Sequence, residues 1–244
     1  MNTIVSAFVS NINSRYEDSL KTYYNFGKLL LQSSVPKIIF VDQPMFDLIG
    51  ENYDNTTTLI VKINALDSYL YGYTDKLTKF EINSTKPEKD TLGFIFTMCN
   101  KTEWVKQAIH LNHFQTDNFI WIDFGIRYIF KNNCSDEEFV EKINCLQYKQ
   151  YDNIRIGGIW GINNKYNINI YKNIAWYFAG GVFGGNSRNL IKFAELMKEK
   201  CLHIITVHNT IMWETNVWYL IWGENKDLFD IYKCDHNATL IECY

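Results

Sequence analysis

One carboxylate in this sequence directly follows a run of apolar residues. Asp123 ends the stretch FIWID (119–123), and Gly125 comes two positions later. The run predicts a buried β-strand, and a carboxylate at the end of such a strand must be paired, hydrated or bound to a cation. A glycine beside it lets a ligand approach the backbone, which suits a divalent cation shared with a diphosphate. Asp123 is therefore a candidate metal ligand; alternatively, it caps a loop or accepts backbone hydrogen bonds.

A cluster of glycines forms the second candidate site. In the segment AGGVFGG (179–185), four glycines flank the pair Val182 and Phe183, and a predicted helix follows. Such a cluster favours positive φ angles or a close approach to the backbone, and N–H groups at the start of a helix can face a polar ligand. The spacing differs from the GxGxxG of dinucleotide-binding folds. The alternative is a tight turn packed on the core.

The third candidate site is a tryptophan-rich segment, IMWETNVW (211–218). An unpaired carboxylate at Glu214 would be costly in partly buried surroundings, so a cation or a hydroxyl is expected beside it. Sugars pack their apolar faces on indole rings while their hydroxyls bond carboxylates and amides, a mixture that Trp213, Glu214, Asn216 and Trp218 provide. The alternative is an amphipathic helix with aromatic core residues and a solvated glutamate, which these residue types alone favour.

Three further polar residues are candidates for the same site. His236, in KCDHNATL (233–240), could supply a late ligand to a metal held by Asp123, although lone histidines are more often structural. Asn100 and Lys101 lie at a predicted strand-to-helix turn, where they could meet a phosphate; a solvated lysine is the alternative. The sequence contains no GxSxG, Walker A or HExxH pattern, so hydrolase, P-loop and zincin functions lack their usual support.

The elements that must position these residues alternate along the chain. Ser135 and Glu138 have the spacing of a capping box at the start of one predicted helix. Short apolar runs alternating with helix-like segments predict an α/β sandwich with a mostly parallel central sheet, in which ligands bind at the carboxyl ends of the strands. We expect strands at 3–9, 37–42, 58–63, 93–98, 119–125, 154–160 and 179–184, and helices at 18–32, 101–111, 136–147, 187–200 and 210–222.

Composition narrows the classes of protein to consider. The 244 residues are 47% hydrophobic and have no linker-like stretch, which predicts a single domain over 1–244. A net charge of −3 and a pI near 6.0 argue against nucleic acid as a partner. No apolar stretch is long enough to span a bilayer and no signal peptide is evident, so we expect a cytoplasmic protein without a transmembrane segment. Six cysteines without CxxC or CxxH spacing indicate reduced thiols.

Taken in order, TIVSAFV, KIIFVD, WIDFG, AGGVFGG and WET make the chain resemble a glycosyltransferase of the GT-A fold. In particular, it is similar to the HtrL/YibB-like (WlaTC) family of bacterial and viral proteins, whose members have a WIDxG core and a GGxFGG segment and look like sugar transferases. More distantly, it resembles the blood-group-type retaining α1,3-galactosyltransferases, which carry an AGxFGG-like segment and a later catalytic glutamate. The resemblance covers most of the chain.

The resemblance implies a fold, a reaction and a set of site residues. The fold would be a GT-A-like Rossmann-type sandwich flanked by helices. The reaction would move a sugar, by expectation a hexose, from a nucleotide-diphosphate sugar, UDP-sugar favoured, to a glycan or other hydroxyl acceptor. In a viral protein this would serve glycan biosynthesis in the host cytoplasm. Asp123 and His236 would hold a divalent cation, Mn²⁺ before Mg²⁺, and Glu214 and Asp123 would be catalytic. The implied donor contacts are Asn100, Lys101, Trp121, Gly125, Gly180, Gly181, Phe183, Gly184, Gly185 and Trp213, and the acceptor contacts are Asn216 and Trp218.

Two departures from the family pattern keep other functions open. The usual DxD is Asp-Phe-Gly here, so Gly125 cannot ligate a metal, and Trp213 stands where the distant family has an aspartate. These departures favour a catalytically degenerate module that binds a carbohydrate or a nucleotide. A nucleotide-dependent enzyme of another type, such as a methyltransferase, is a third hypothesis, but TIVSAFVSNINS lacks the glycine-rich turn expected there.

Overall fold

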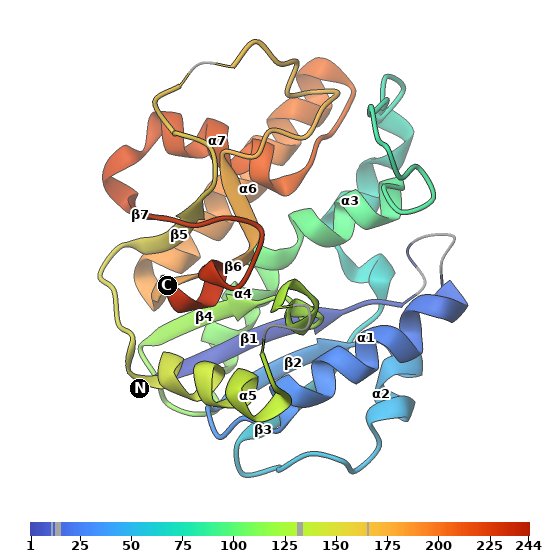
Figure 1. Ribbon diagram of the computed structural model, residues 1–244. Helices are drawn as coiled ribbons and strands as arrows, with labels where there is room; N and C mark the ends of the chain where they lie inside the picture. The colour runs from blue at the N-terminus through green and yellow to red at the C-terminus, as the bar shows by residue number, and fades with distance from the viewer. Residues whose placement is uncertain (11, 13–15, 131–133, 165) are drawn as a thin grey trace.

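A seven-stranded sheet organises the chain in the computed structural model, which describes residues 1–10, 12, 16–130, 134–164 and 166–244 (Figure 1). The strand order is β3-β2-β1-β4-β6-β5-β7. Strand β6 is antiparallel to β4 and β5, and the other neighbouring pairs are parallel. The predicted α/β sandwich with a mostly parallel sheet is confirmed. The strands are β1 (Asn2–Phe8), β2 (Lys37–Val41), β3 (Thr58–Lys62), β4 (Asn118–Ile122), β5 (Ile154–Gly158), β6 (Phe178–Asn186) and β7 (Phe229–Lys233).

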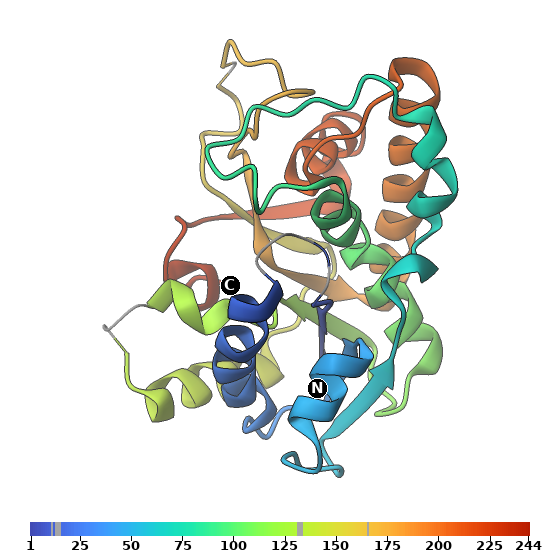
Figure 2. The same ribbon diagram turned by 90° about the vertical axis from the view of Figure 1, so that its right-hand side faces the viewer.

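Helices cover both faces of the sheet, and Figure 2 shows the sheet between them. Alternate strand residues face opposite layers: Val5 and Trp121 pack on one, Ile4 and Ile120 on the other. The first layer holds α3 (Leu92–Cys99), α4 (Lys101–Leu111), α6 (Ser187–His208) and α7 (Glu214–Glu224), and the second holds α1 (Tyr16–Leu31), α2 (Gln43–Ile49), α5 (Asp136–Cys145) and α8 (Thr239–Glu242). Short 3₁₀ turns lie at Ala65–Asp67, Tyr69–Lys76, Ile126–Phe130, Leu146–Tyr148 and Lys226–Leu228.

Several elements differ from the sequence prediction, and helices α2 and α8 were not expected. The run GFIFTM (93–98), expected as a strand, lies in helix α3, where the Thr91 side chain caps the first turn by accepting from the Phe94 N–H. A short apolar run that is buried in either form cannot be assigned by periodicity alone. Strand β7 was not predicted because FDIYK mixes charged and apolar residues, as suits a strand at the edge of the sheet.

Helix boundaries follow local capping groups. The capping box predicted at the start of α5 is confirmed, since the Ser135 hydroxyl accepts from the Glu138 N–H and the Glu138 carboxylate accepts from the Ser135 N–H. Helix α6 continues to His208, beyond the predicted end, and stops at Asn209, which has a φ of 54°. Helix α7 begins at Glu214 and not at residue 210, which brings Glu214 to a helix N-terminus.

The strand directions bring distant segments to one edge of the sheet. Asp123 follows β4, and its N–H donates to the Gly181 carbonyl at 2.9 Å because antiparallel β6 starts where β4 ends. His236 follows β7, which is parallel to β5. The strand order reverses between β1 and β4, and open α/β sheets bind ligands at such a switch point, outside the carboxyl ends of the strands.

Lys37 lies buried at the start of β2, away from this edge. Its Nζ donates to the Ser33 carbonyl at 2.7 Å and to Thr58 Oγ1 at 3.3 Å. Burial lowers the pKa of Lys37 from 10.5 to about 8, although Asp54 opposes the shift. A folded-state pKa below the unfolded one means that the protonated lysine disfavours folding at neutral pH.

We expect Lys37→Met to remove a pH dependence of stability. Between about pH 8 and 10.5 the unfolded chain binds more protons at Lys37 than the native chain, so the free energy of unfolding rises with pH. From pH 7.5 to pH 10, urea unfolding should show the wild type gaining about 2–3 kcal/mol relative to Lys37→Met. The control Lys21→Met, at an exposed lysine of α1, should behave like the wild type. Equal slopes in wild type and Lys37→Met would contradict the assignment.

Candidate functional site

The carboxyl edge of the sheet borders a cavity of about 950 Å³. Its lining comes from the end of β4, the start of β6, the first turn of α7, the segments 83–90 and 174–176, and His236. A smaller cavity of about 130 Å³ lies at the ends of β1 and β4, at the switch point of the sheet. The two cavities adjoin, because Tyr23, Lys89, Phe94, Met98, Asp123 and Tyr128 line both.

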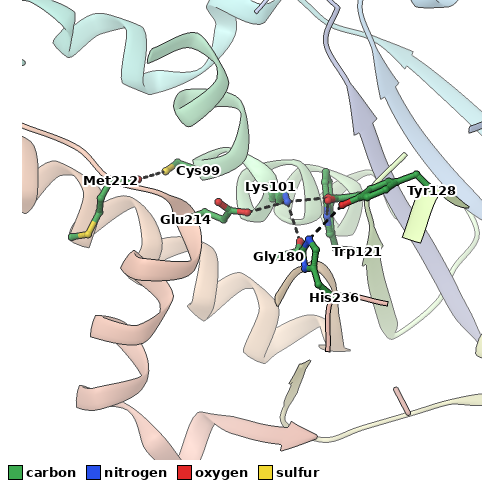
Figure 3. A network of polar contacts seen from close by, with 9 residues as sticks. Cys99, Lys101, Trp121, Tyr128, Gly180, Met212, Glu214 and His236 are labelled. Carbon is green, nitrogen blue, oxygen red and sulfur yellow. Dashed lines mark hydrogen bonds and ion pairs between the residues drawn. The ribbon is translucent and has the colours of Figure 1, made fainter. Parts of the chain in front are cut away.

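A buried lysine connects the polar groups at the wall of the large cavity. The Nζ of Lys101 lies 2.9 Å from Asp123 Oδ1, 3.1 Å from Glu214 Oε1 and 2.9 Å from the Gly180 carbonyl oxygen. Figure 3 shows Lys101 between Glu214 and Gly180. The three donors of the ammonium thus meet three acceptors. Burial by itself would lower the pKa of Lys101, but the carboxylates of Asp123 and Glu214 outweigh it and raise the pKa, so the group stays charged.

The position of Lys101 follows from a junction between two helices. Asn100 ends α3 and precedes α4, so Lys101 is the first residue of α4. This corrects the predicted strand-to-helix turn and the alternative of a solvated lysine. Asn100 is buried and lines neither cavity. Lys101 lines the large cavity but is engaged with carboxylates, which makes it a positioning group more than a phosphate ligand.

Gly180 is required by the packing of the charged groups. A Cβ at this position would overlap Glu214 Oε1 and lie 3.3 Å from Lys101 Nζ. The carboxylate and the ammonium therefore occupy the space that a side chain would fill. Gly181, the next residue, also lines the cavity. Two of the five glycines predicted as donor contacts thus line the large cavity.

Asp123 has one engaged oxygen and one that a ligand can reach. Oδ1 accepts from Trp121 Nε1 at 2.8 Å in addition to Lys101, while the side chain as a whole is 34% exposed and lines both cavities. Trp121 lines the small cavity and stacks between Trp104 and Phe183. Gly125 lines the same cavity, where a Cβ would meet the Tyr23 ring. Because Oδ1 is engaged, Oδ2 is the oxygen of Asp123 that is available to a ligand.

His236 faces the large cavity together with Asp123. Its Nε2 lies 3.4 Å from the Tyr128 hydroxyl (Figure 3). Its ring packs edge-on against Trp176, with 4.9 Å between the ring centroids. Burial lowers the pKa of His236, with Asp123 acting in the opposite direction. A neutral imidazole is the form that binds metals.

The residues at the site fit a divalent cation that shares its coordination with a ligand. In the part of the chain that the structure describes, no group of three His, Cys, Asp or Glu side chains gathers to hold a metal. Asp123 and His236 are therefore two candidate protein ligands. A cation between them would need further oxygen ligands from a bound diphosphate or from water. Mg²⁺ sites commonly use one or two carboxylates plus substrate phosphates, and in this pair Asp123 supplies the carboxylate.

Besides Asn100, five predicted contact residues line neither cavity. Phe183 and Trp218 are fully buried and pack against each other in the core. A Cβ at Gly184 would overlap the Tyr244 hydroxyl, and one at Gly185 would lie 2.6 Å from the Asn153 carbonyl oxygen, so both glycines serve close strand packing. The fifth residue is Asn216. It is buried and its side chain bonds the backbone of residues 170, 173 and 175.

Three residues at the site carry no sequence signal of their own. Trp176 and Thr215 line the large cavity, and Tyr128 lines both cavities. Trp213, which the resemblance did predict, also lines the large cavity. Trp176 stands in an irregular segment without a motif, and only the tertiary fold brings it to His236. Thr215 directly follows Glu214, so its position near the site was predictable from the sequence, although its role was not.

Lys101→Met should strongly destabilise the protein. The change leaves the buried Glu214 carboxylate, 7% exposed, and the partly buried Asp123 without their cation. Removing one partner of a buried ion pair costs about 3–5 kcal/mol, which urea unfolding at pH 7.5 would measure. Lys106→Met on the same helix is the control, because Lys106 lies 4.0 Å from Glu103 in a more exposed pair and should cost less than about 1 kcal/mol. Equal losses in the two variants would disprove the central role of Lys101.

Gly180→Ala tests the close packing of the charged groups. The added methyl group must displace the Glu214 carboxylate, and overpacking of this kind costs about 1–3 kcal/mol. Gly223→Ala is the matched control: it lies in α7 with nothing within 4 Å of the new methyl group, so it should stabilise the protein by about 0.5–1 kcal/mol. Melting temperatures of the two variants should therefore move in opposite directions, and a Gly180→Ala protein as stable as the wild type would contradict the geometry.

Comparisons with known proteins give a family and two distant structural likenesses. No curated protein matches the sequence. Mouse xyloside xylosyltransferase 1, in its apo form, is similar with a TM-score of 0.48 and 10% identity, over 96% of this chain and 86% of that chain. The 4-diphosphocytidyl-2C-methyl-D-erythritol synthase of Anaerococcus prevotii gives a TM-score of 0.44 and 9% identity, over 95% and 86%. Likenesses this distant carry no argument about function.

The family assignment rests on the sequence. Residues 2–240 match the family model described as a bacterial protein of unknown function (HtrL_YibB). This match spans nearly the whole chain and includes the Asp123, Gly180 and Glu214 segments. The protein belongs to the HtrL_YibB family.

Proposed function

We propose that this protein is a glycosyltransferase, which moves a sugar from a nucleotide-diphosphate sugar to a hydroxyl group of a glycan acceptor. The observation that carries the proposal is the arrangement of Asp123 and Glu214, two carboxylates held by one buried ammonium at the wall of a single cavity. The cavity lies at the carboxyl edge of the sheet, where open α/β folds bind nucleotides. UDP-sugars are the favoured donors and a hexose the favoured sugar.

The two adjoining cavities suggest how the donor lies. Phe8, Tyr23 and Trp104 line the small cavity, and these flat apolar rings suit a nucleobase. Asp123 lines both cavities, so a diphosphate between base and sugar would pass its carboxylate. Asp123 Oδ2 and His236 would hold the divalent cation, Mn²⁺ favoured, which when bound offsets the charge on the departing phosphate.

Transfer breaks the bond between the anomeric carbon and the diphosphate oxygen, and forms a bond from that carbon to an acceptor oxygen, which loses its proton. Positive charge develops on the sugar, so a fixed carboxylate nearby stabilises the transition state. Glu214 suits this role because Lys101 engages Oε1, which leaves Oε2 for a contact with the sugar. The divalent cation that Asp123 and His236 would hold would offset the negative charge of the leaving diphosphate.

Aromatic side chains and a second loop suggest the acceptor subsite. Trp176 and Trp213 line the large cavity, and indole rings pack against the apolar faces of sugars. The segment 83–90 lies across from them and is tied to the Trp176 segment, since the Asn83 N–H donates to the Lys172 carbonyl at 2.6 Å. We therefore propose Trp176, Trp213 and the segment 83–90 as acceptor contacts, instead of the buried Asn216 and Trp218.

A binding module without turnover is the second candidate function. It is favoured by Gly125, which stands where the resemblance expects a second metal-ligating carboxylate. Such a module would bind a nucleotide or a sugar at the same cavity and release no nucleoside diphosphate. Turnover therefore separates the two functions.

The testing experiment measures binding and turnover separately. Thermal shifts with UDP, UDP-glucose, UDP-galactose and UDP-N-acetylglucosamine, with and without Mn²⁺, should show stabilisation that needs both nucleotide and metal. Glu214→Gln should keep the donor-induced shift but lower UDP release in the presence of oligosaccharide acceptors by about 100-fold or more. Asp123→Asn should lose the metal-dependent part of the shift. Donor binding without UDP release by the wild type would favour the binding module. No shift with any of these nucleotides would overturn the glycosyltransferase and any module that binds these nucleotides.

A further inference from the structure

Lys89 is the one lysine or arginine that lines both cavities in the part of the chain that the structure describes. Lys86 and Lys101 line the large cavity but not the small one. Asp123 also lines both cavities, and the proposed function places a diphosphate beside it. Lys89 is therefore the cationic residue at the junction where this diphosphate would lie.

Two observations place the ammonium group of Lys89, and not only the residue, at this junction. Its Nζ lies 4.8 Å from the centroid of the Phe94 ring, and Phe94 also lines both cavities. Burial is the main cause that lowers the pKa of His236, and the charge of Lys89 acts in the same direction. The ammonium thus lies within electrostatic reach of a side chain that faces the large cavity.

Local hydrogen bonds fix the backbone that carries Lys89. The Lys89 N–H donates to the Lys86 carbonyl at 2.9 Å, and the Lys89 carbonyl accepts from the Thr91 N–H at 2.9 Å. The Ser84 hydroxyl donates to the Asp90 carboxylate within the same turn, and Thr91 then caps helix α3. Because the turn is already ordered, a contact through Lys89 costs the protein little more than the ordering of one side chain.

The charges at the cavity wall favour a contact between Lys89 and a diphosphate. The ammonium of Lys101 is shared between the carboxylates of Asp123 and Glu214, so these three groups together keep a net negative charge. That charge repels an anionic ligand, and Lys101 has no donor left for it because its third bond goes to the Gly180 carbonyl. An ammonium at the junction supplies both positive charge and N–H donors for phosphate oxygens.

We propose that the ammonium group of Lys89 binds the diphosphate of the nucleotide-sugar donor. This assignment rests on the proposed function, because it takes the ligand of the two cavities to be a nucleotide diphosphate. Lys89 then contributes to the affinity for UDP and for UDP-sugars. It does not contribute to the affinity for uridine, which has no phosphate.

Lys79 provides a matched control. It is exposed, lies shortly before the segment 83–90 and lines neither cavity. Replacing either lysine with methionine keeps an unbranched side chain and removes one positive charge. The two variants therefore share the change in net charge and differ in contact with the cavities.

The test compares Lys89→Met and Lys79→Met by calorimetric titration with Mn²⁺ present. Lys89→Met should bind UDP, and the tightest of UDP-glucose, UDP-galactose and UDP-N-acetylglucosamine, about 5- to 30-fold more weakly than the wild type, the loss of one charge-assisted contact. Its affinity for uridine, measured by displacement of UDP, should not change, and Lys79→Met should match the wild type for every ligand. Both unliganded variants should melt within about 2 °C of the wild type.

Three results would overturn the assignment of Lys89. The first is an unchanged affinity of Lys89→Met for UDP, and the second is an equal loss for UDP and for uridine, which would mean a disturbed base site. The third is the same loss in Lys79→Met, which would trace the effect to net charge. In each case a wild type that binds a UDP-sugar leaves the proposed function standing, whereas a wild type that binds none of these nucleotides removes both.

Discussion

The buried ammonium of Lys101 is the interaction on which the site depends. A charge inside a protein is tolerated only when oppositely charged or polar groups surround it, and here Asp123, Glu214 and the Gly180 carbonyl do so. These acceptors belong to three separate parts of the chain: the end of β4, the start of α7 and the first residues of β6. One lysine thus aligns two carboxylates that the backbone alone would leave free to repel each other.

The sheet topology supplies the setting for this lysine. Because β6 runs antiparallel to β4, its first residues and not its last ones lie beside Asp123. The parallel pair β5 and β7 then carries His236 to the same edge. Residues from positions 22 to 240 therefore line one cavity. The small cavity at the switch point extends the site toward the first strand.

Much of this arrangement was predictable from sequence, and the remainder depended on tertiary contacts. Asp123 and Glu214 were identifiable because carboxylates are conspicuous within apolar or aromatic runs, and the glycines at 180 and 181 because they form a cluster. The same reasoning extended the donor site to Gly184 and Gly185, which a strand packs against its neighbours instead. Lys101 looked like a surface residue until the junction of α3 and α4 placed it inside. Trp176 gave no signal, since nothing local distinguishes an aromatic ring in a loop from one in a cavity wall.

The side chain of Asn216 ties helix α7, which carries Glu214, to the segment next to Trp176, a residue of the proposed acceptor subsite. We call this segment the acceptor wall. The Asn216 side chain bonds the backbone of residues 170, 173 and 175, next to Trp176, while sitting two residues after Glu214 in α7. The wall and the helix thus form one preassembled body before any substrate arrives. Because the wall is already ordered, binding of an acceptor would cost the protein little conformational entropy. In the proposed function, selectivity among acceptors on this side of the cavity would come from complementarity of shape, and not from a segment that must fold around the substrate.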